Sequence, residues 1–529
     1  SSTLSSAAVP HAFANCTPLS FCGMNGCHGL GHRLPGVMTA KLRPRHYGGL
    51  LALACGASAV WTPGRRRAPE DGDGADVMQQ VSWGEPLDMP EEGGLAPEPA
   101  PPGAFRQRLY NFHDLQYFAV MQVGDQRIRG IVDTGSFELV VFSTACSTCG
   151  VAPAYSEKLS PSFQSGTVQE EHVYGSGSCI TQDGRDQVVI GPLSAKQQAI
   201  WMATSCRMPL LDRAAFNAII GVGPPGQQEY AYQKMLTDLD NLRPRNADRS
   251  ANDRLEQERK RIQQQFAVVR DRTSILQSFG VRTFSTCFGR EPNSPAWIVW
   301  NDTNPKGFPG VTSVPVVGNL MWTVQVYDVG FSQVNGPDVS LGCETGCGAI
   351  VDTGTSLLGV PGDMLQAVRR TVTNSDFDCS DLSQFPDLVM TLGGTRLRLP
   401  PDAYIGTLFG FTGSQLHSLL HMTSATPSSV VQCQLLLMDL GTEFTQFGPL
   451  LILGMPFFRE YYTTFDTGKD HGNRTVFVTP ADEQCQPARQ AKQSGQVFRR
   501  HRRAMKPRRV DASMVRMPEW LPQRRGVDV

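Results

Sequence analysis

The segment Ile131-Val132-Asp133-Thr134-Gly135-Ser136 recurs later in the chain as Ile350-Val351-Asp352-Thr353-Gly354-Thr355. In both copies an apolar pair precedes the aspartate, and Thr-Gly and a hydroxyl residue follow it. One Asp-Thr-Gly triplet arises easily by chance, but two copies with matching flanks do not. The duplication predicts two apolar strands that each deliver one carboxylate.

Asp133 and Asp352 are the candidate catalytic pair. Hydrolysis of a peptide bond by two carboxyls needs one carboxylate to take a proton from water and one carboxylic acid to donate a proton to the scissile carbonyl. Two carboxyls within hydrogen-bond reach cannot both ionise cheaply, so they share a proton and titrate as a coupled pair.

The residues after each aspartate suit a supporting role. Glycine lets the backbone approach closely, the threonine hydroxyls can bond across to the opposite loop, and the last hydroxyl of each copy can donate to the outer carboxylate oxygen. The candidate supporting residues are Thr134, Gly135, Ser136, Thr353, Gly354 and Thr355.

Further motifs surround the two loops in a fixed order. They are, along the chain, Tyr117-Phe118, Val123-Gly124, Tyr174-Gly175-Ser176-Gly177-Ser178, Phe216-Asn217-Ala218-Ile219-Ile220-Gly221, Leu451-Ile452-Leu453-Gly454, Tyr461-Tyr462 and Phe465-Asp466. In order and spacing, residues 110–481 resemble the pepsin family of aspartic endopeptidases, and protist branches of that family more than gastric enzymes.

The resemblance implies an all-β, bilobal fold, with two similar β lobes and an active-site cleft between them, plus one inserted helix. It implies an endopeptidase that cuts proteins and peptides without a cofactor or a metal ion. Tyr174, Gly175 and Ser176 would form the flap over the substrate. Ile219 would line the pocket beside the catalytic pair, and a plain core isoleucine is the alternative.

The chain departs from the family in the spacing of its two aspartates, which the insertion at 228–278 lengthens, and in two further places. The family often has a tryptophan shortly after its first catalytic loop that hydrogen-bonds the flap tyrosine, whereas this chain reads Phe137-Glu138-Leu139-Val140-Val141. Pepsin-like proenzymes usually carry a basic propeptide whose lysine occupies the cleft, whereas residues 68–104 are short and acidic. Self-activation by that route is therefore not expected.

The chain has 14 cysteines, more than a reduced cytosolic enzyme usually carries, which favours the secretory pathway: a secreted, vacuolar or other endomembrane protein. Family positions imply Cys146–Cys149, Cys343–Cys347 and Cys379–Cys433, with Cys179–Cys206 as a further candidate pair, and no partner is predicted for Cys287 or Cys485.

Near the start of the chain lies a zinc-like group of residues, Cys22, Cys27, His28 and His32. It lacks a supporting hairpin, and we predict no metal site there.

The expected organisation has four parts. Residues 1–104 form a leader, with a signal-like segment at 38–60 and an acidic, Pro-rich prosegment or linker after it; a buried apolar segment is the alternative for the apolar run. Residues 105–300 form the N-terminal lobe with the flap, and residues 301–482 form the C-terminal lobe. Residues 483–529 are basic and are expected to be disordered.

Residues 228–278 interrupt the β pattern with a charged, Gln-rich insertion. Leu255, Ile262, Phe266 and Val269, spaced by 7, 4 and 3 residues, share one helical face. We expect an amphipathic helix that packs on its own lobe, and a partner-binding helix is the alternative.

A net charge of −1 argues against a nucleic-acid or membrane-surface role, and we expect a monomeric zymogen. A non-catalytic binding protein on the same fold would be expected to lose an aspartate or a glycine, and both loops are intact. A half-length homodimeric protease fused to another domain is disfavoured because one chain carries both loops and a flap.

Overall fold

A computed structural model describes residues 100, 103–152, 154–241, 249–303, 305–308, 310–332, 337–372, 379–410, 414–421, 432–469, 473–488 and 507–518. The predicted signal-like segment and the group Cys22, Cys27, His28 and His32 lie outside the described residues, as does the acidic stretch up to residue 99.

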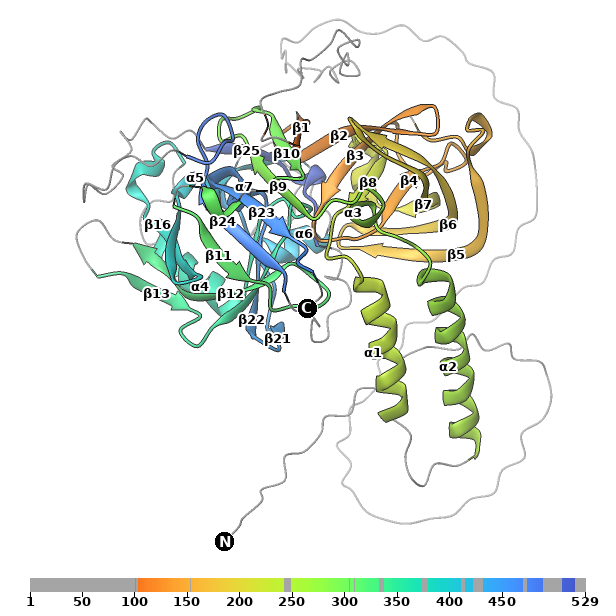
Figure 1. Cartoon of the computed structure of the whole chain (residues 1–529). Helices are drawn as coiled ribbons and strands as arrows, with labels where there is room; N and C mark the ends of the chain where they lie inside the picture. Colours follow the sequence, from red (N-terminus) through yellow and green to blue (C-terminus); the bar gives the residue numbers. More distant parts are fainter. Residues whose placement is uncertain are drawn as a thin grey trace, which may run out of the picture. The chain divides into compact units, whose positions relative to one another are not determined.

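Strands dominate both halves of the described chain, because runs of Val, Ile, Phe and Tyr fit a pleated, half-buried surface. The N-terminal lobe contains one end of the largest sheet (Figure 1). Its strands are, in spatial order, β2 (Gln116–Val123), β3 (Gln126–Asp133), β8 (Ala218–Gly221), β4 (Leu139–Phe142), β7 (Leu193–Arg207), β6 (Gly177–Ile190) and β5 (Gln164–Tyr174). A further pairing of β2 with β6 folds this sheet back on itself.

The other end of the same sheet joins the two halves of the chain. Its strands continue from β2 as β1 (Phe105–Phe112), β10 (Ala296–Trp300), β9 (Thr283–Phe288), β23 (Tyr461–Asp466), β24 (Thr475–Pro480) and β11 (Thr312–Pro315). These neighbours all pair antiparallel. The side chains of Phe284 in β9 and Phe465 in β23 pack against each other, with ring centroids 4.9 Å apart, and both contact Trp322.

The C-terminal lobe is built on a second sheet. Its strands are β17 (Thr395–Leu399), β16 (Asp387–Leu392), β12 (Thr323–Ser332), β14 (Cys347–Val351), β22 (Gly448–Leu453), β15 (Leu358–Val360) and β20 (Leu437–Asp439), with β13 (Val339–Gly342) on β12 and β21 (Phe444–Thr445) on β22. A small third sheet contains β19 (Gln432–Leu435), β18 (Ile405–Phe409) and β25 (Arg508–Asp511).

The two lobes repeat one arrangement of strands. In the N-terminal lobe β3 pairs parallel with β8, which pairs antiparallel with β4. In the C-terminal lobe β14 pairs parallel with β22, which pairs antiparallel with β15. The predicted all-β, bilobal architecture is confirmed.

Helices are short except in the insertion. The remaining α-helices of the described chain are α4 (Gly362–Val372), α5 (Pro401–Tyr404), α6 (Ser414–Leu419) and α7 (Met455–Glu460). The 3₁₀ turns are η1 (Glu157–Leu159), η2 (Pro209–Arg213), η3 (Pro305–Gly307), η4 (Leu382–Gln384) and η5 (Ala512–Met514). None of the described helices is long and apolar enough to cross a membrane.

The insertion differs from the single helix that we expected. It forms α1 (Gln227–Asn241) and α2 (Arg249–Val269), which lie side by side, followed by the short α3 (Ile275–Ser278) (Figure 1). Ile262 is buried, and the Phe266 ring lies 6.0 Å from that of Tyr232 in α1. The sequence pattern identified the apolar face of α2 but not α1, whose own side chains supply part of the surface that this face contacts.

Five disulfides lie in the described chain. Cys146–Cys149, Cys179–Cys206, Cys343–Cys347 and Cys379–Cys433 are as predicted. The fifth, Cys287–Cys485, joins β9 to the turn after β24 across a sequence separation of 198 residues. Neither of its cysteines has a near neighbour in sequence, so spacing gave no signal for this pair.

The prediction of a disordered tail is wrong for residues 483–488, which include the disulfide-bonded Cys485, and for residues 507–518. Strand β25 adds parallel to β18, and η5 follows it. Val510, Ala512, Met514 and Val515 are buried in an apolar cluster with residues such as Leu408. The high density of arginines in the tail concealed this apolar pattern.

The packing beneath the interlobe sheet gives a testable prediction. Phe465 is fully buried, whereas Phe444 is 56% exposed. Because Phe465→Ala leaves a cavity among stacked rings, we expect it to lower the free energy of unfolding by about 3–5 kcal/mol, and Phe444→Ala to change it by less than about 0.5 kcal/mol. Urea denaturation followed by tryptophan fluorescence measures both values, and equal effects of the two substitutions would contradict this packing.

Candidate active site

The two candidate catalytic aspartates lie at equivalent positions of the two lobes. Asp133 ends β3 and Asp352 directly follows β14. Each is fixed to the parallel neighbour of its strand: Asp133 O accepts from Val222 N at 2.8 Å, and Asp352 N donates to Leu453 O at 3.0 Å. Asp133 is 6% and Asp352 3% exposed. The duplicated strand pairing therefore brings both carboxyls to one buried place between the lobes.

The threonines after the aspartates bond across to the opposite loop. Thr134 Oγ1 donates to Val351 O and Thr353 Oγ1 donates to Val132 O, both at 2.9 Å. Each Oγ1 also accepts from the other threonine's backbone N–H, at 2.9 and 3.0 Å. These four reciprocal hydrogen bonds join the two loops to each other.

The glycines set the distance between the carboxyls. A Cβ on Gly135 would lie 2.7 Å from Asp352 Oδ1, and one on Gly354 would lie 2.2 Å from Asp133 Oδ1. Only glycine allows each loop to lie this close to the opposite carboxyl. Each glycine N–H also donates to the aspartate of its own loop, at 2.9 Å for Asp133 and 2.7 Å for Asp352.

The last hydroxyl residue of each loop breaks this symmetry. Thr355 Oγ1 donates to Asp352 Oδ2 at 2.5 Å. Ser136 Oγ is buried and has no hydrogen-bond partner among the described residues. The corresponding oxygen, Asp133 Oδ2, instead accepts at 3.0 Å from Nη2 of Arg516, a residue of the C-terminal tail.

The environment favours a proton on Asp352. Burial is the largest effect on this carboxyl, the negative charge of Asp133 is the next, and together they raise the pKa of Asp352 to about 7. The hydrogen bonds from Thr355 and Gly354 and the charge of Arg516 act in the opposite direction but only in part. One neutral and one ionised carboxyl can thus face each other near neutral pH.

The hairpin β5–β6 places the predicted flap over the two aspartates. Tyr174 pairs with Gly177, so Gly175 and Ser176 form the tip. Tyr174, Ser176 and Ile219 line the same cavity as Asp133 and Asp352. Gly175 does not itself line this cavity but lies against Pro518, which does: a Cβ on Gly175 would lie 2.1 Å from Pro518 O.

Sequence reasoning missed six residues that line this cavity. Met208, Leu210 and Phe216 are apolar and come from the chain before β8; the position of Phe216 at the start of that motif was a usable signal. Arg516, Met517 and Pro518 come from the tail, and the motifs of the family gave no indication of them.

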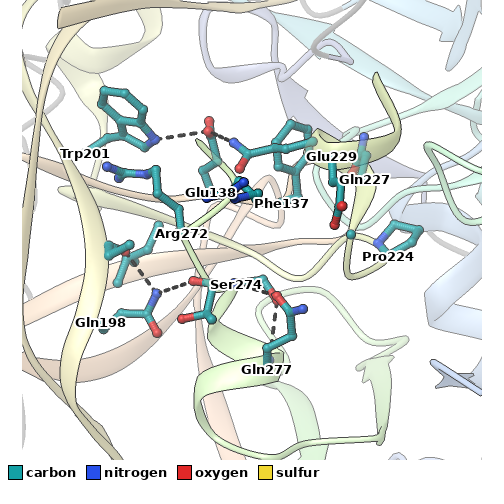
Figure 2. A pocket seen from close by; sticks show the side chains of 16 residues that line it. Phe137, Glu138, Gln198, Trp201, Pro224, Gln227, Glu229, Arg272, Ser274 and Gln277 are labelled. Atoms are coloured by element: carbon teal, nitrogen blue, oxygen red, sulfur yellow. Dashed lines mark hydrogen bonds between the residues drawn. The ribbon is translucent and has the colours of Figure 1, made fainter. Parts of the chain in front are cut away.

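A polar cluster occupies the region where the family's tryptophan was expected. Glu138, in the loop before β4, accepts from Trp201 Nε1 at 3.0 Å and pairs with His172 Nδ1 of the flap strand β5 at 2.9 Å (Figure 2 shows the contact with Trp201). Arg272 lies over the Trp201 ring, 4.0 Å from its centroid. The cluster connects the first catalytic loop, the flap strand and the end of the insertion.

Charge pairing favours the ionised forms of Glu138 and His172. Burial alone would favour neutral Glu138, but His172 and Arg272 lower the pKa of Glu138 below its usual value. Burial likewise disfavours charged His172, but Glu138 raises the pKa of His172 above its usual value. The buried contact between His172 and Glu138 therefore joins the flap strand, close to its tip, to the loop that carries Asp133.

The described residues contain one group of possible metal ligands, Cys146, Cys149 and Cys206. All three sulfurs belong to disulfides and offer no thiolate.

Comparisons with known proteins identify the family of the chain. Residues 116–248 and 258–474 match the family described as eukaryotic aspartyl protease. Pepsin A of Bos taurus is 26% identical over 376 residues, which cover 69% of this chain and 85% of that protein. Cathepsin E-B of Xenopus laevis is 26% identical over 385 residues (70% and 81%), and cathepsin E-A of the same organism is 27% identical over 385 residues (70% and 81%). The chain belongs to the eukaryotic aspartyl protease family and is a hydrolase of the aspartic-type endopeptidase class.

Proposed function

We propose that Asp133 and Asp352 form the catalytic pair and hydrolyse peptide bonds through one activated water molecule. The observation that carries this proposal is the reciprocal contact of the loops, in which the glycine after each aspartate lies against the opposite carboxyl. Two buried carboxyls that repel each other when both are charged share a proton, as in aspartic proteases generally.

The raised pKa of Asp352 supports a division of roles between the two carboxyls. Asp352 carries the proton, and Asp133 accepts a proton from the water. The water oxygen bonds to the scissile carbonyl carbon while Asp352 donates its proton to the carbonyl oxygen. The resulting tetrahedral diol then returns a hydroxyl proton to Asp352. Asp133 donates its proton to the amide nitrogen, and the carbon–nitrogen bond breaks to give a carboxylic acid and an amine.

The substrate would lie as an extended peptide between the flap and the catalytic loops. Backbone groups at Gly135, Gly354, Gly175 and Ser176 can make strand-like hydrogen bonds to it. Met208, Leu210, Phe216 and Ile219 line the adjoining cavity, which favours an apolar substrate side chain on the side of Asp133.

Both catalytic loops come from one chain, so we propose that the monomer is the active unit. The five disulfides of the described chain support an oxidising compartment of the secretory pathway.

Replacement of either aspartate by asparagine tests whether Asp133 and Asp352 form the catalytic pair. Asp133→Asn and Asp352→Asn should each lower kcat/KM on an internally quenched peptide by about 10²- to 10⁴-fold. The exposed Asp125 provides the matched control, since Asp125→Asn removes one carboxylate of the same lobe without touching the cleft. Unchanged circular dichroism would show that each variant is folded, and an Asn variant that keeps more than about a tenth of the activity would refute the assignment.

The pH dependence tests the assignment of the proton to Asp352. Because activity needs the protonated carboxyl, kcat/KM should fall as the pH rises through about 7. The Thr355 hydroxyl stabilises ionised Asp352, so Thr355→Val should raise its pKa further and move this descending limb to higher pH. If the descending limb of the pH profile stays in place or moves to lower pH in Thr355→Val, a group other than Asp352 determines that limb.

A further inference from the structure

We propose that residues 507–518 are an intramolecular inhibitor of this protease, which fills the substrate cleft and places Arg516 against Asp133. This inference rests on the proposed catalytic role of the two aspartates.

The central contact is a buried ion pair at the catalytic carboxyl. Arg516 Nη2 lies 3.0 Å from Asp133 Oδ2, and the two side chains are 9% and 8% exposed. Charge-assisted hydrogen bonds of this kind are shorter and stronger than neutral ones. Asp133 Oδ2 therefore already accepts a hydrogen bond from a cation, on the carboxylate that must take a proton from water.

The backbone of the segment occupies the path of a substrate. Arg516 O accepts from Ser356 N at 3.1 Å, and Arg516 N donates to Ser356 Oγ at 2.9 Å. Met517 N donates to Ser176 Oγ at the flap tip at 3.1 Å. The segment thus runs between the flap and the second catalytic loop, and a peptide substrate cannot lie there at the same time.

The segment is bound without presenting a cleavable bond. The group that it directs at Asp133 is a guanidinium nitrogen, while the Arg516 carbonyl oxygen is used by Ser356. Attack by a water molecule between the carboxyls needs a peptide carbonyl in that position. This geometry is that of an inhibitor rather than that of a substrate.

Contacts upstream of Arg516 anchor the segment to both lobes. Strand β25 pairs parallel with β18 from Gly406↔Arg508 to Phe409↔Asp511. Buried Arg508 pairs with Asp114 at 2.8 Å, and Arg213 of the N-terminal lobe contacts Asp511 and Ser513 at 3.4 and 3.0 Å.

Apolar burial adds to these polar contacts. Val510, Ala512, Met514 and Val515 are at most 4% exposed and belong to a cluster with leucines of the C-terminal lobe. A segment tethered in the same chain acts at a high effective concentration, so even a modest interaction at the cleft suffices to exclude substrate.

The missing hydrogen bond of Ser136 fits the same interpretation. Thr355 holds the equivalent position in the other loop and donates to the outer oxygen of Asp352. Ser136 Oγ, by contrast, makes no hydrogen bond within the described chain. Arg516 supplies the bond that Asp133 Oδ2 would otherwise take from a neighbouring hydroxyl or from water.

Arg516→Ala in the full chain is the direct test. Loss of the ion pair should free the cleft and raise kcat/KM on a quenched peptide by about 10- to 100-fold. The matched control is Arg127→Ala, which removes the same charge from an exposed position of β3 outside the segment and should leave kcat/KM unchanged. An equal rise in both variants would attribute the effect to net charge and overturn the inference.

A binding measurement separates this inference from the catalytic proposal. A statine-type peptide occupies the cleft without being cleaved, so its affinity by calorimetry should rise in Arg516→Ala by the same factor as kcat/KM. Higher affinity without any activity would support the inhibitor and refute the catalytic pair. Unchanged affinity together with unchanged activity would refute the inhibitor and leave the catalytic pair intact.

Two further variants test whether the charge of Arg516 and its position in the cleft cause the inhibition. Arg516→Lys keeps the charge and should retain part of the inhibition, while Arg516→Ala/Asp352→Asn should be inactive yet bind the statine peptide better than Asp352→Asn alone. If Arg516→Ala does not fold, Arg516→Met preserves the apolar stem of the side chain and provides the same comparison. A double variant that binds no better than Asp352→Asn would contradict the proposal.

Discussion

The reciprocal hydrogen bonds of Thr134 and Thr353 are the constraint on which the rest of the site depends. Each hydroxyl both donates to and accepts from the opposite loop, at 2.9 to 3.0 Å, so neither loop can shift alone. With both loops fixed, each glycine lies against the opposite carboxyl. The raised pKa of Asp352 follows from the burial and close negative charge that this arrangement imposes.

The same constraint gives the tail its binding site. A fixed, buried carboxylate attracts a cation strongly, and an isolated buried charge is unfavourable. The Arg516 guanidinium lies 3.0 Å from the carboxylate of Asp133 and offsets its charge. Regulation of the site would then lie at the C-terminal end of the chain, whereas the acidic stretch at 68–104 offers no lysine for the cleft.

Much of the site could be predicted because the sequence repeats. The duplicated Ile-Val-Asp-Thr-Gly segments identified both aspartates, and the paired apolar motifs identified β8 and β22, which lie beside them. Three disulfides followed from family positions, and Cys179–Cys206 was a further candidate. Cys287–Cys485 could not be predicted, since a separation of 198 residues leaves no local pattern.

Other features depended on contacts that no local pattern encodes. Glu138, His172 and Trp201 lie on three separate elements and meet only after the lobe has folded. Disorder of the tail was predicted wrongly for a related reason. The prediction relied on the many arginines of the tail and did not consider Val510, Met514 and Val515, which are buried. Helix α1 was not predicted, because the spacing of apolar residues indicated a helical face only in α2.

A crystal structure of the full chain with a statine-type peptide tests the central claim, that the fixed aspartate pair is the catalytic site and that Arg516 competes for it. The account predicts the statine hydroxyl within hydrogen-bond distance of both Asp133 and Asp352, with Arg516 displaced from Asp133. A peptide bound elsewhere, with the pair of Arg516 and Asp133 intact, would contradict it.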